Sequence, residues 1–246
     1  MIDGRNQDPT VFNDQVISRL CHRRFGIGAD GLIILEESQQ YDFRMRYFNS
    51  DGGEGTMCGN GGRCIVLFAN RLGMIESETT FEGIDGRHHA RLLHGNTIRL
   101  KLNDVKGITP YEDGYLLDTG SPHFVKFVSR VEPLNVQEEG REIRNQERFG
   151  PGGVNVNFVA PSGTRDTISV RTYERGVEAE TYSCGTGVTA AAICTAVHLK
   201  SDNISYLVET RGGSLRVDFN VAGKDLFTDV TLTGEASEAF KGSFEI

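Results

Sequence analysis

The sequence predicts an α+β protein of two pseudo-symmetric lobes, each a mostly antiparallel sheet wrapped around a central helix. Three observations predict this fold class. Short alternating strands fill both halves, each half contains a turn of cysteine and glycine, and each such turn opens an apolar helical stretch. The turns are Cys58 to Gly62, before the apolar run 65–69, and Ser183 to Gly187, before 188–193. A duplicated fold explains this repetition.

The first half begins with a helix candidate at 16–21, followed by a glycine cluster at 26–31 that we assign to turn geometry. Strands are predicted at 32–35 and 43–48, before the cysteine and glycine turn and its helix. A hairpin follows, with strands at 88–93 and 97–102 joined by His94-Gly95-Asn96. The adjacent His88 and His89 are expected at the surface, because neighbouring strand side chains point to opposite faces.

A boundary is predicted at 103–113, which is rich in Gly, Pro and Asp. It gives an N-terminal lobe of residues 1–106 and a C-terminal lobe of residues 107–234. The second lobe should contain a polar helix at 143–149 in addition to the helix at 188–193. Its strands are predicted at 115–118, 124–128, 154–159, 168–173, 206–209, 215–219 and 229–232.

Composition places the chain among soluble globular proteins. Its 246 residues are 38% hydrophobic and 9% aromatic, enough for a sizeable core. The net charge of −8, without a block of Lys and Arg, argues against nucleic acid or an anionic membrane surface as a partner. No apolar run reaches transmembrane length, and residues 1–10 lack the features of a signal peptide, so we expect a cytoplasmic protein.

The five cysteines are expected to be reduced thiols. An odd number in a chain of this length, without a C-x-x-C pair, favours a reducing compartment and argues against a structural metal. Cys21, Cys64 and Cys194 are read as structural residues, because a thiol without a partner behaves as a small hydrophobe. Cys58 and Cys184 are different, because each stands at a predicted helix start.

A helix start supplies two properties that suit acid–base chemistry on a bound anion. Consecutive N–H groups of a glycine-rich turn can bind an anion, and a thiol there is more readily ionised. Two such starts that face each other would place one sulfur on each side of a bound anion. A proton could then be removed from one side of a carbon and returned on the other. For one such cysteine, a structural role is about as common as a reactive one.

Six segments in order carry a family resemblance: NSDG, MCGNGGRC, GSPHFV, NVNFV, YERG and SCGTG. In this order and spacing the chain resembles the diaminopimelate epimerases over nearly its whole length. The resemblance implies two α/β lobes with the active site in the cleft between them, and a C-terminal segment, about 235–246, that rejoins the first lobe. It also implies a homodimer that works without a cofactor or metal and converts LL-2,6-diaminopimelate to the meso isomer in lysine and peptidoglycan precursor synthesis.

The resemblance also implies roles for individual residues. Cys58 and Cys184 would be the two bases, one thiolate and one thiol, with His123 and Glu174 as the partners that tune them. Arg175 would bind the distal carboxylate of the substrate through its fork of donors. The implied substrate-binding residues are Asn49, Gly59, Asn60, Gly61, Asn155, Glu174, Arg175, Gly185 and Thr186.

Two positions depart from the family pattern. Members begin with a strand and a Gly-Asn-Asp-Phe-like turn before the segment that reads Met1 to Arg5 here, and this sequence does not include it. Ser121 stands where many members have Asn before the Pro-His pair.

Other functions compete with the epimerase prediction. A different two-thiol racemase, acting on proline or hydroxyproline, would keep both cysteines but need another pocket. A truncated, catalytically impaired chain that acts only as a binding protein is a second alternative, and a Cys-His hydrolase a weaker third. By themselves, His123 could be a satisfied loop histidine and Glu174-Arg175 a solvated surface pair.

Overall fold

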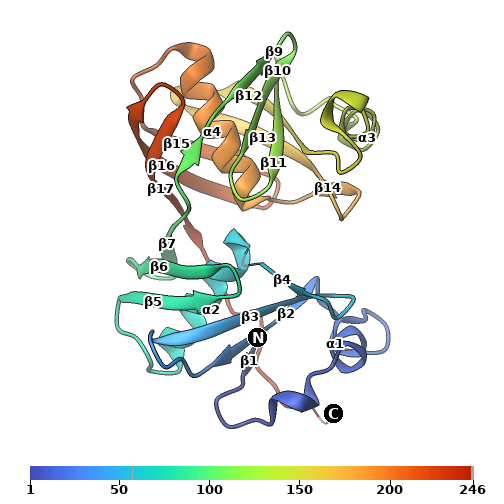
Figure 1. Ribbon diagram of the computed structural model, residues 1–246, viewed down its shortest axis with the longest axis vertical. Helices are drawn as coiled ribbons and strands as arrows, with labels where there is room; N and C mark the ends of the chain where they lie inside the picture. The colour runs from blue at the N-terminus through green and yellow to red at the C-terminus, as the bar shows by residue number, and fades with distance from the viewer. Residues whose placement is uncertain (57, 245–246) are drawn as a thin grey trace. The chain divides into compact units, whose positions relative to one another are not determined.

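The computed structural model describes residues 1–56 and 58–244, and the chain forms two compact units (Figure 1). Unit 1 contains Met1–Leu100 and Glu235–Ile246, and unit 2 contains Lys101–Gly234. Residues 245–246, the end of the predicted returning segment, lie outside the described residues. None of the helices in the described part of the chain combines the length and the apolar character that a membrane crossing needs.

Unit 1 is a mixed sheet with two helices. Strand β2 pairs in parallel with β1 and antiparallel with β3, which pairs antiparallel with β4 and in parallel with β5. Strands β5, β6 and β7 continue as an antiparallel meander. The elements are β1 (Ile2–Asp3), a 3-10 turn (Pro9–Val11), α1 (Asp14–Cys21), β2 (Gly31–Glu36), β3 (Phe43–Asn49), β4 (Glu54–Gly55), α2 (Gly59–Arg71), β5 (Glu78–Gly83), β6 (Gly86–Leu92) and β7 (Thr97–Lys101).

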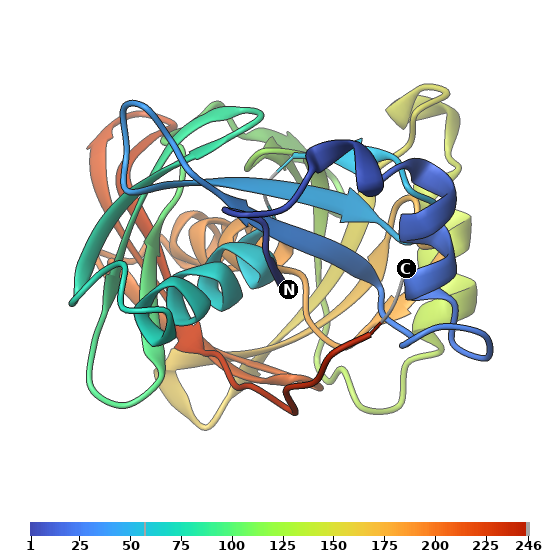
Figure 2. The ribbon, with the colours of Figure 1, turned by 90° about the horizontal axis from the view of Figure 1, so that it is seen from below.

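Strand β2 is covered on both faces, which explains its uninterrupted apolar run. Leu32 and Ile34 pack with Ile17 and Cys21 of α1. Ile33, on the opposite face, lies against the first turn of α2, because a Cβ on Gly61 would be 3.1 Å from its Cδ1 atom. In Figure 2, α2 (teal) runs along the blue strands β2 and β3. Contacts with the sheet therefore fix the position of the first turn of α2.

The C-terminal segment is tied to unit 1 by two contacts. The Ala236 N–H donates to the Asn96 carbonyl oxygen at 3.0 Å, and Arg71 of α2 forms an ion pair with Glu238 at 2.8 Å. The chain thus returns to unit 1 after the last strand of unit 2.

Unit 2 is built around α4. Its sheet runs in the order β9-β10-β11-β12-β13, with β14 and β15 both beside β13, followed by β16, β17 and β8. All of these pairs are antiparallel except β11 with β12 and β13 with β15. The elements are β8 (Val105–Lys106), β9 (Thr109–Tyr111), β10 (Gly114–Asp118), β11 (Pro122–Phe127), α3 (Val136–Arg144), a 3-10 turn (Glu147–Phe149), β12 (Asn155–Ser162), β13 (Thr164–Glu174), β14 (Ala179–Thr181), α4 (Gly185–Leu199), β15 (Ser205–Thr210), β16 (Gly213–Gly223) and β17 (Leu226–Glu235).

Strand β12 is also buried on both faces. Val156, Phe158 and Ala160 belong to the cluster that packs with α3, whereas Val159 belongs to the cluster around α4. Because side chains alternate along a strand, Asn155 and Asn157 share the α4 face with Val159. Two asparagines thus lie on the side of the sheet that meets the start of α4.

Two sequence predictions about local structure are wrong. The polar helix is α3, Val136–Arg144, which reaches only the start of the predicted range 143–149, and a 3-10 turn, Glu147–Phe149, forms the end of that range. The Asn135 side chain accepts a hydrogen bond from the Glu138 N–H and starts the helix at this earlier position. His88 is buried rather than on the surface, because its ring packs 5.3 Å from that of Phe81 and Nε2 lies 3.0 Å from Asp85.

Candidate active site

The first cysteine and glycine turn forms the N-terminus of α2. Cys58 is the N-cap residue, with extended backbone angles of φ −100° and ψ 150°, and its Sγ atom accepts a hydrogen bond from the Gly61 N–H at 3.3 Å. A Cβ on Gly61 would lie 3.2 Å from this sulfur, so glycine permits the close approach. The helix dipole and this N–H together favour negative charge at the sulfur position.

A buried cation, which sequence reasoning missed, lies one turn further along α2. Arg63 is only 6% exposed, and its guanidinium donates to the Gly59 carbonyl oxygen at 3.1 Å and to Asn60 Oδ1 at 3.0 Å. Burial lowers the pKa of Arg63, while the nearby thiols of Cys64 and Cys58 act in the opposite direction. Because Oδ1 of Asn60 accepts from Arg63, the orientation of the Asn60 amide is fixed.

Asn49 ends β3 and stands at the entrance to the loop before α2. Its N–H donates to the Gly53 carbonyl oxygen at 2.9 Å, and its own carbonyl accepts from the Gly52 N–H at 3.0 Å. Gly52 has a φ of +97°, which only glycine adopts readily, so this tight turn depends on it. The predicted site residues of unit 1 therefore follow one another along the β3–α2 connection.

The second cysteine and glycine turn forms the N-terminus of α4. Cys184 is the N-cap residue and 8% exposed, but its side chain makes no capping hydrogen bond to the helix backbone. Its Sγ atom lies 3.5 Å from the Thr186 hydroxyl oxygen. Thr119 donates to the Thr186 carbonyl oxygen at 2.9 Å and so anchors this turn to the end of β10.

His123 reaches the Cys184 sulfur through Thr186. It is completely buried, and its Nε2 atom lies 2.9 Å from Thr186 Oγ1 and 3.0 Å from Ser121 Oγ. Burial, assisted by the charge of Arg175, lowers the pKa of His123 to about 3. The imidazole is therefore neutral at physiological pH, and it lies on β11 rather than in a loop.

Asn155 joins Arg175 and Ser121 to the same group. Its Oδ1 accepts from the Arg175 backbone N–H at 2.9 Å, and its Nδ2 donates to Ser121 Oγ at 3.2 Å and to the Pro122 carbonyl oxygen at 3.1 Å. Ser121, at the position where the sequence departs from the family pattern, thus links Asn155 to His123.

The remaining predicted residues of unit 2 lie on the same elements. Glu174 is the half-buried last residue of β13, and Arg175 follows it as an exposed side chain. Gly185 is the buried first residue of α4. The structure therefore brings His123, Asn155, Thr186 and Cys184 into one hydrogen-bonded group of unit 2, with Arg175 attached through its backbone.

Sequence reasoning did not assign Asn157 and Thr172 to the site. Asn157 is fully buried and contacts His123, and Thr172, which is 3% exposed, donates to Asn157. The available signal was the second asparagine of NVNFV, a polar side chain at an alternate position of an otherwise apolar strand.

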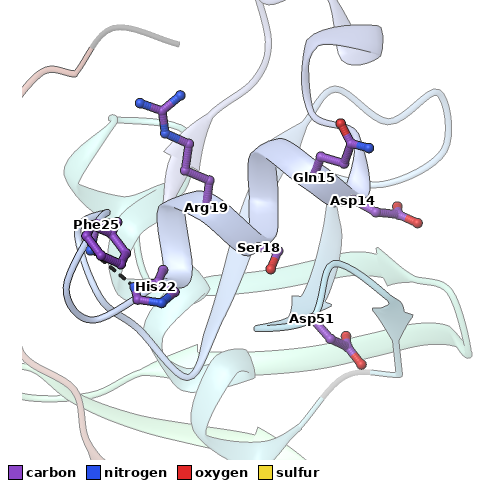
Figure 3. Close-up of a pocket in the computed structure, with 7 residues that line it drawn as sticks. All are labelled: Asp14, Gln15, Ser18, Arg19, His22, Phe25 and Asp51. Atoms are coloured by element: carbon purple, nitrogen blue, oxygen red, sulfur yellow. Dashed lines mark hydrogen bonds between the residues drawn. The ribbon is translucent and has the colours of Figure 1, made fainter.

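A surface hollow beside α1 contains none of these residues (Figure 3). His22 in this hollow accepts the Arg24 and Phe25 N–H groups at its Nδ1 atom, each at 3.1 Å, and so serves the turn after the helix. The hollow is lined by Asp14, Gln15, Ser18, Arg19, His22, Phe25 and Asp51.

In the described part of the chain, no three His, Cys, Asp or Glu side chains are placed to hold a metal ion.

Solved structures support the predicted fold class. A Bacillus anthracis phenazine biosynthesis protein of the PhzF family superimposes with a TM-score of 0.74 at 14% identity, covering 95% of this chain and 88% of its own. A probable proline racemase from Agrobacterium radiobacter K84 gives a TM-score of 0.65 at 17% identity, covering 94% of this chain and 79% of its own. At these identities the likeness concerns the fold.

Sequence comparison shows the family. The diaminopimelate epimerase of Flavobacterium psychrophilum is 45% identical over 241 residues, which cover 98% of this chain and 93% of that protein. The diaminopimelate epimerase of Aquifex aeolicus is 40% identical over 246 residues, which cover 94% and 86%. The model of the family described as diaminopimelate epimerase matches residues 1–100 and 115–238. The chain therefore belongs to the diaminopimelate epimerase family.

Proposed function

We propose that this protein is an isomerase that converts LL-2,6-diaminopimelate to meso-diaminopimelate, in lysine and peptidoglycan precursor biosynthesis. One observation carries the proposal: cysteines occupy the N-cap positions of both α2 and α4, in a chain of this family. Both helices are long enough, at 13 and 15 residues, for a full dipole at their first turns.

The proposed chemistry is a proton transfer through two thiols. One sulfur, as thiolate, takes the α-proton, and the electron pair moves into the adjacent carboxylate to give an enediolate. The other sulfur, as thiol, donates its proton to the opposite face of the same carbon. The first cysteine is then the thiol and the second the thiolate, so the roles are exchanged for the reverse reaction. This mechanism requires that both sulfurs reach one carbon.

Backbone N–H groups of the two helix starts stabilise the enediolate in this proposal. Gly59, Gly61, Gly185 and Thr186 supply donors to the reacting carboxylate, where negative charge increases in the transition state. Arg175 binds the distal carboxylate, and Asn49, Asn60 and Asn155 fix the polar ends of the substrate. His123 and Glu174 support the thiols. The fixed amides of Asn60 and Asn155 support this assignment.

We further propose that the protein acts as a cytoplasmic homodimer without a cofactor, and that its partner is this small molecule rather than nucleic acid. The net charge of −8 supports the last point, and sedimentation velocity measures the assembly. A monomer that epimerises at full rate would refute the dimer.

The test of the reaction is incubation of the full chain with LL-diaminopimelate under reducing conditions, followed by chiral chromatography. The expected product is the meso isomer, approaching a mixture of the two forms. L-Proline and trans-4-hydroxy-L-proline serve as matched control substrates and should remain unchanged. Inversion of either control, with LL-diaminopimelate unchanged, would refute the proposed substrate.

A further inference from the structure

Three buried polar side chains of unit 2 lie together because of strand register. His123 pairs with Asn155 across the parallel strands β11 and β12, and Asn157 pairs directly with Thr172 across the antiparallel strands β12 and β13. His123, Asn157 and Thr172 therefore project from the same face of the sheet. Their exposed fractions are 0%, 0% and 3%, so water does not complete their hydrogen bonds from outside.

The surroundings of Asn157 fix which end of its amide faces His123. The Asn157 amide nitrogen lies 3.3 Å from the Phe124 carbonyl oxygen, which can only accept a hydrogen bond. The Thr172 hydroxyl donates to Asn157 Oδ1 at 2.9 Å. The NH2 end is therefore the end that meets His123 Nδ1, at 3.1 Å.

This contact determines the tautomer of His123. Because Nδ1 accepts a hydrogen bond from Asn157, it carries no proton, and the proton of the neutral ring is on Nε2. Arg175 is the charged group that acts on the ring, and together with burial it keeps the ring neutral. The Nε2–H group then donates toward Thr186 Oγ1 at 2.9 Å, with Ser121 Oγ at 3.0 Å as its second neighbour.

The Thr186 hydroxyl completes the chain of hydrogen bonds. Because its oxygen accepts from His123, its own hydrogen is directed to another acceptor, and the Cys184 sulfur lies 3.5 Å away. The Thr119 hydroxyl donates to the carbonyl oxygen of Thr186 at 2.9 Å and so holds the Thr186 backbone in place. A donated hydrogen bond stabilises negative charge on sulfur.

We propose that Asn157 and Thr172 are positioning residues that hold His123 as the neutral Nε2–H tautomer, so that the Thr186 hydroxyl donates to the Cys184 sulfur. His123 then acts as a hydrogen-bond donor and does not take the thiol proton. The hydroxyl stabilises the sulfur in its thiolate state, after it has given its proton to the substrate carbon. This inference rests on the proposed function for its role in the reaction, although the hydrogen-bond chain itself needs no substrate.

The tautomer is tested by long-range 1H–15N NMR of the full chain labelled with 15N-histidine, recorded from pH 5 to 8. The His123 signals are assigned by their loss in H123Q. We expect an unprotonated Nδ1 and a protonated Nε2, unchanged over this pH range. A proton on Nδ1, or titration to the imidazolium within the range, would overturn the proposal.

The positioning role is tested by Asn157→Leu and Thr172→Val, with Thr172→Ser as the control that keeps the hydroxyl. We expect kcat for epimerisation to fall about tenfold in Asn157→Leu and about threefold in Thr172→Val, with KM within about twofold, because a buried hydrogen bond is lost far from the substrate. Thr172→Ser should retain kcat. If Asn157→Leu does not fold, Thr172→Val alone tests the positioning role. A kcat equal to that of the wild type in Thr172→Val would overturn the positioning role of these residues.

A readout that needs no substrate separates this inference from the proposed function. The rate of alkylation of Cys184 by iodoacetamide, followed by mass spectrometry of its peptide, should fall several-fold in Thr186→Val but not in Thr186→Ser. Equal rates in the two variants would overturn the hydrogen bond to sulfur. If the tautomer and the alkylation rates are as expected but diaminopimelate is not turned over, the proposed function is refuted and the hydrogen-bond chain stands.

Discussion

The starts of α2 and α4 share a sequence pattern but differ in how they support sulfur. At α2, Cys58 Sγ accepts the backbone N–H of Gly61, and the cation of Arg63 lies one turn away. At α4, Cys184 Sγ lies beside the Thr186 hydroxyl, which is backed by the neutral ring of His123. One sulfur is thus supported by the helix and a buried charge, the other by a chain of neutral donors. A shared motif therefore does not imply a shared electrostatic environment.

The different packing of the helices explains this contrast. The start of α2 lies against apolar side chains, Ile33 and Met45, and the Gly61 N–H of the helix itself donates to Cys58 Sγ. The start of α4 lies above the polar face of β12, where a Cβ on Gly187 would be 2.4 Å from Asn157 Oδ1. The Thr186 hydroxyl beside Cys184 is therefore backed by a polar side chain of the sheet, His123.

The largest expected effect is the loss of either sulfur. Cys58→Ala and Cys184→Ala should each reduce epimerisation by about a thousandfold or more, because neither thiol can replace the other in a two-base mechanism. Cys64→Ala and Cys194→Ala are matched controls on the same two helices and should keep most activity. Chiral chromatography of the product measures all four, and retained turnover in either single mutant of the first pair would contradict the mechanism.

The next effect concerns the cation at α2. Arg63→Met should lower kcat/KM by about tenfold to a hundredfold, the value of a lost hydrogen bond from a charged group that orients Asn60. The melting temperature should not fall, because the substitution also removes a buried charge. Arg63→Lys keeps the charge without the fork and should lie in between. Steady-state kinetics measure this effect. A kcat/KM in Arg63→Met equal to that of the wild type would show that activity does not depend on the Arg63 cation.

Two glycines at equivalent positions give a stability comparison. Gly187→Ala should cost about 1–3 kcal/mol in the free energy of unfolding, because the new methyl group would overlap the buried amide of Asn157. Gly61→Ala meets the side-chain ends of Ile33, Met45 and Cys58 at 3.1–3.2 Å and gains helix propensity, so it should cost clearly less than Gly187→Ala. Urea denaturation measures both, and equal costs would contradict the proposed difference in packing.

The pH dependence of the stability difference between wild type and His123→Gln should report the burial of the neutral ring beside α4. The pKa of His123 is about 3 in the folded protein and 6.5 for the unperturbed side chain. Its neutral form therefore stabilises the fold fully above pH 6.5, and this contribution is lost as pH falls toward 3, by at most about 1.4 kcal/mol per pH unit. The difference between wild type and His123→Gln isolates this slope from the carboxylates. Parallel curves for the two proteins would contradict burial of the neutral ring.

Local signals predicted the helices that begin at the cysteines. Gly59 starts α2 and Gly185 starts α4, because the glycine turn and the apolar run that follows it are adjacent in sequence. The predicted position of α3 was wrong, because the helix depends on the cap at Asn135 and on a close contact of Gly140. Gly140 packs so near Tyr173 that a Cβ on it would lie 2.3 Å away. That second contact is not visible in the sequence.

The polar groups around the candidate site were harder to predict for the same reason. Asn157 meets His123 and Thr172 only through the registers of β11, β12 and β13, which join residues up to 34 positions apart. Arg63 lies within the most informative motif, but its burial results from packing and not from its neighbours in sequence. The roles assigned from the resemblance, including those of Asn49 and Glu174, stay predictions.

Proton exchange between two thiols and one carbon can be followed directly by 1H NMR of LL-diaminopimelate with this protein in D2O at early times. The inverted carbon of the meso product should carry deuterium from the first turnovers, while the remaining LL substrate keeps its α-proton, because the thiol that donates is not the one that accepts. Deuterium that enters the LL substrate as fast as the product forms would indicate a single base and refute the two-thiol mechanism.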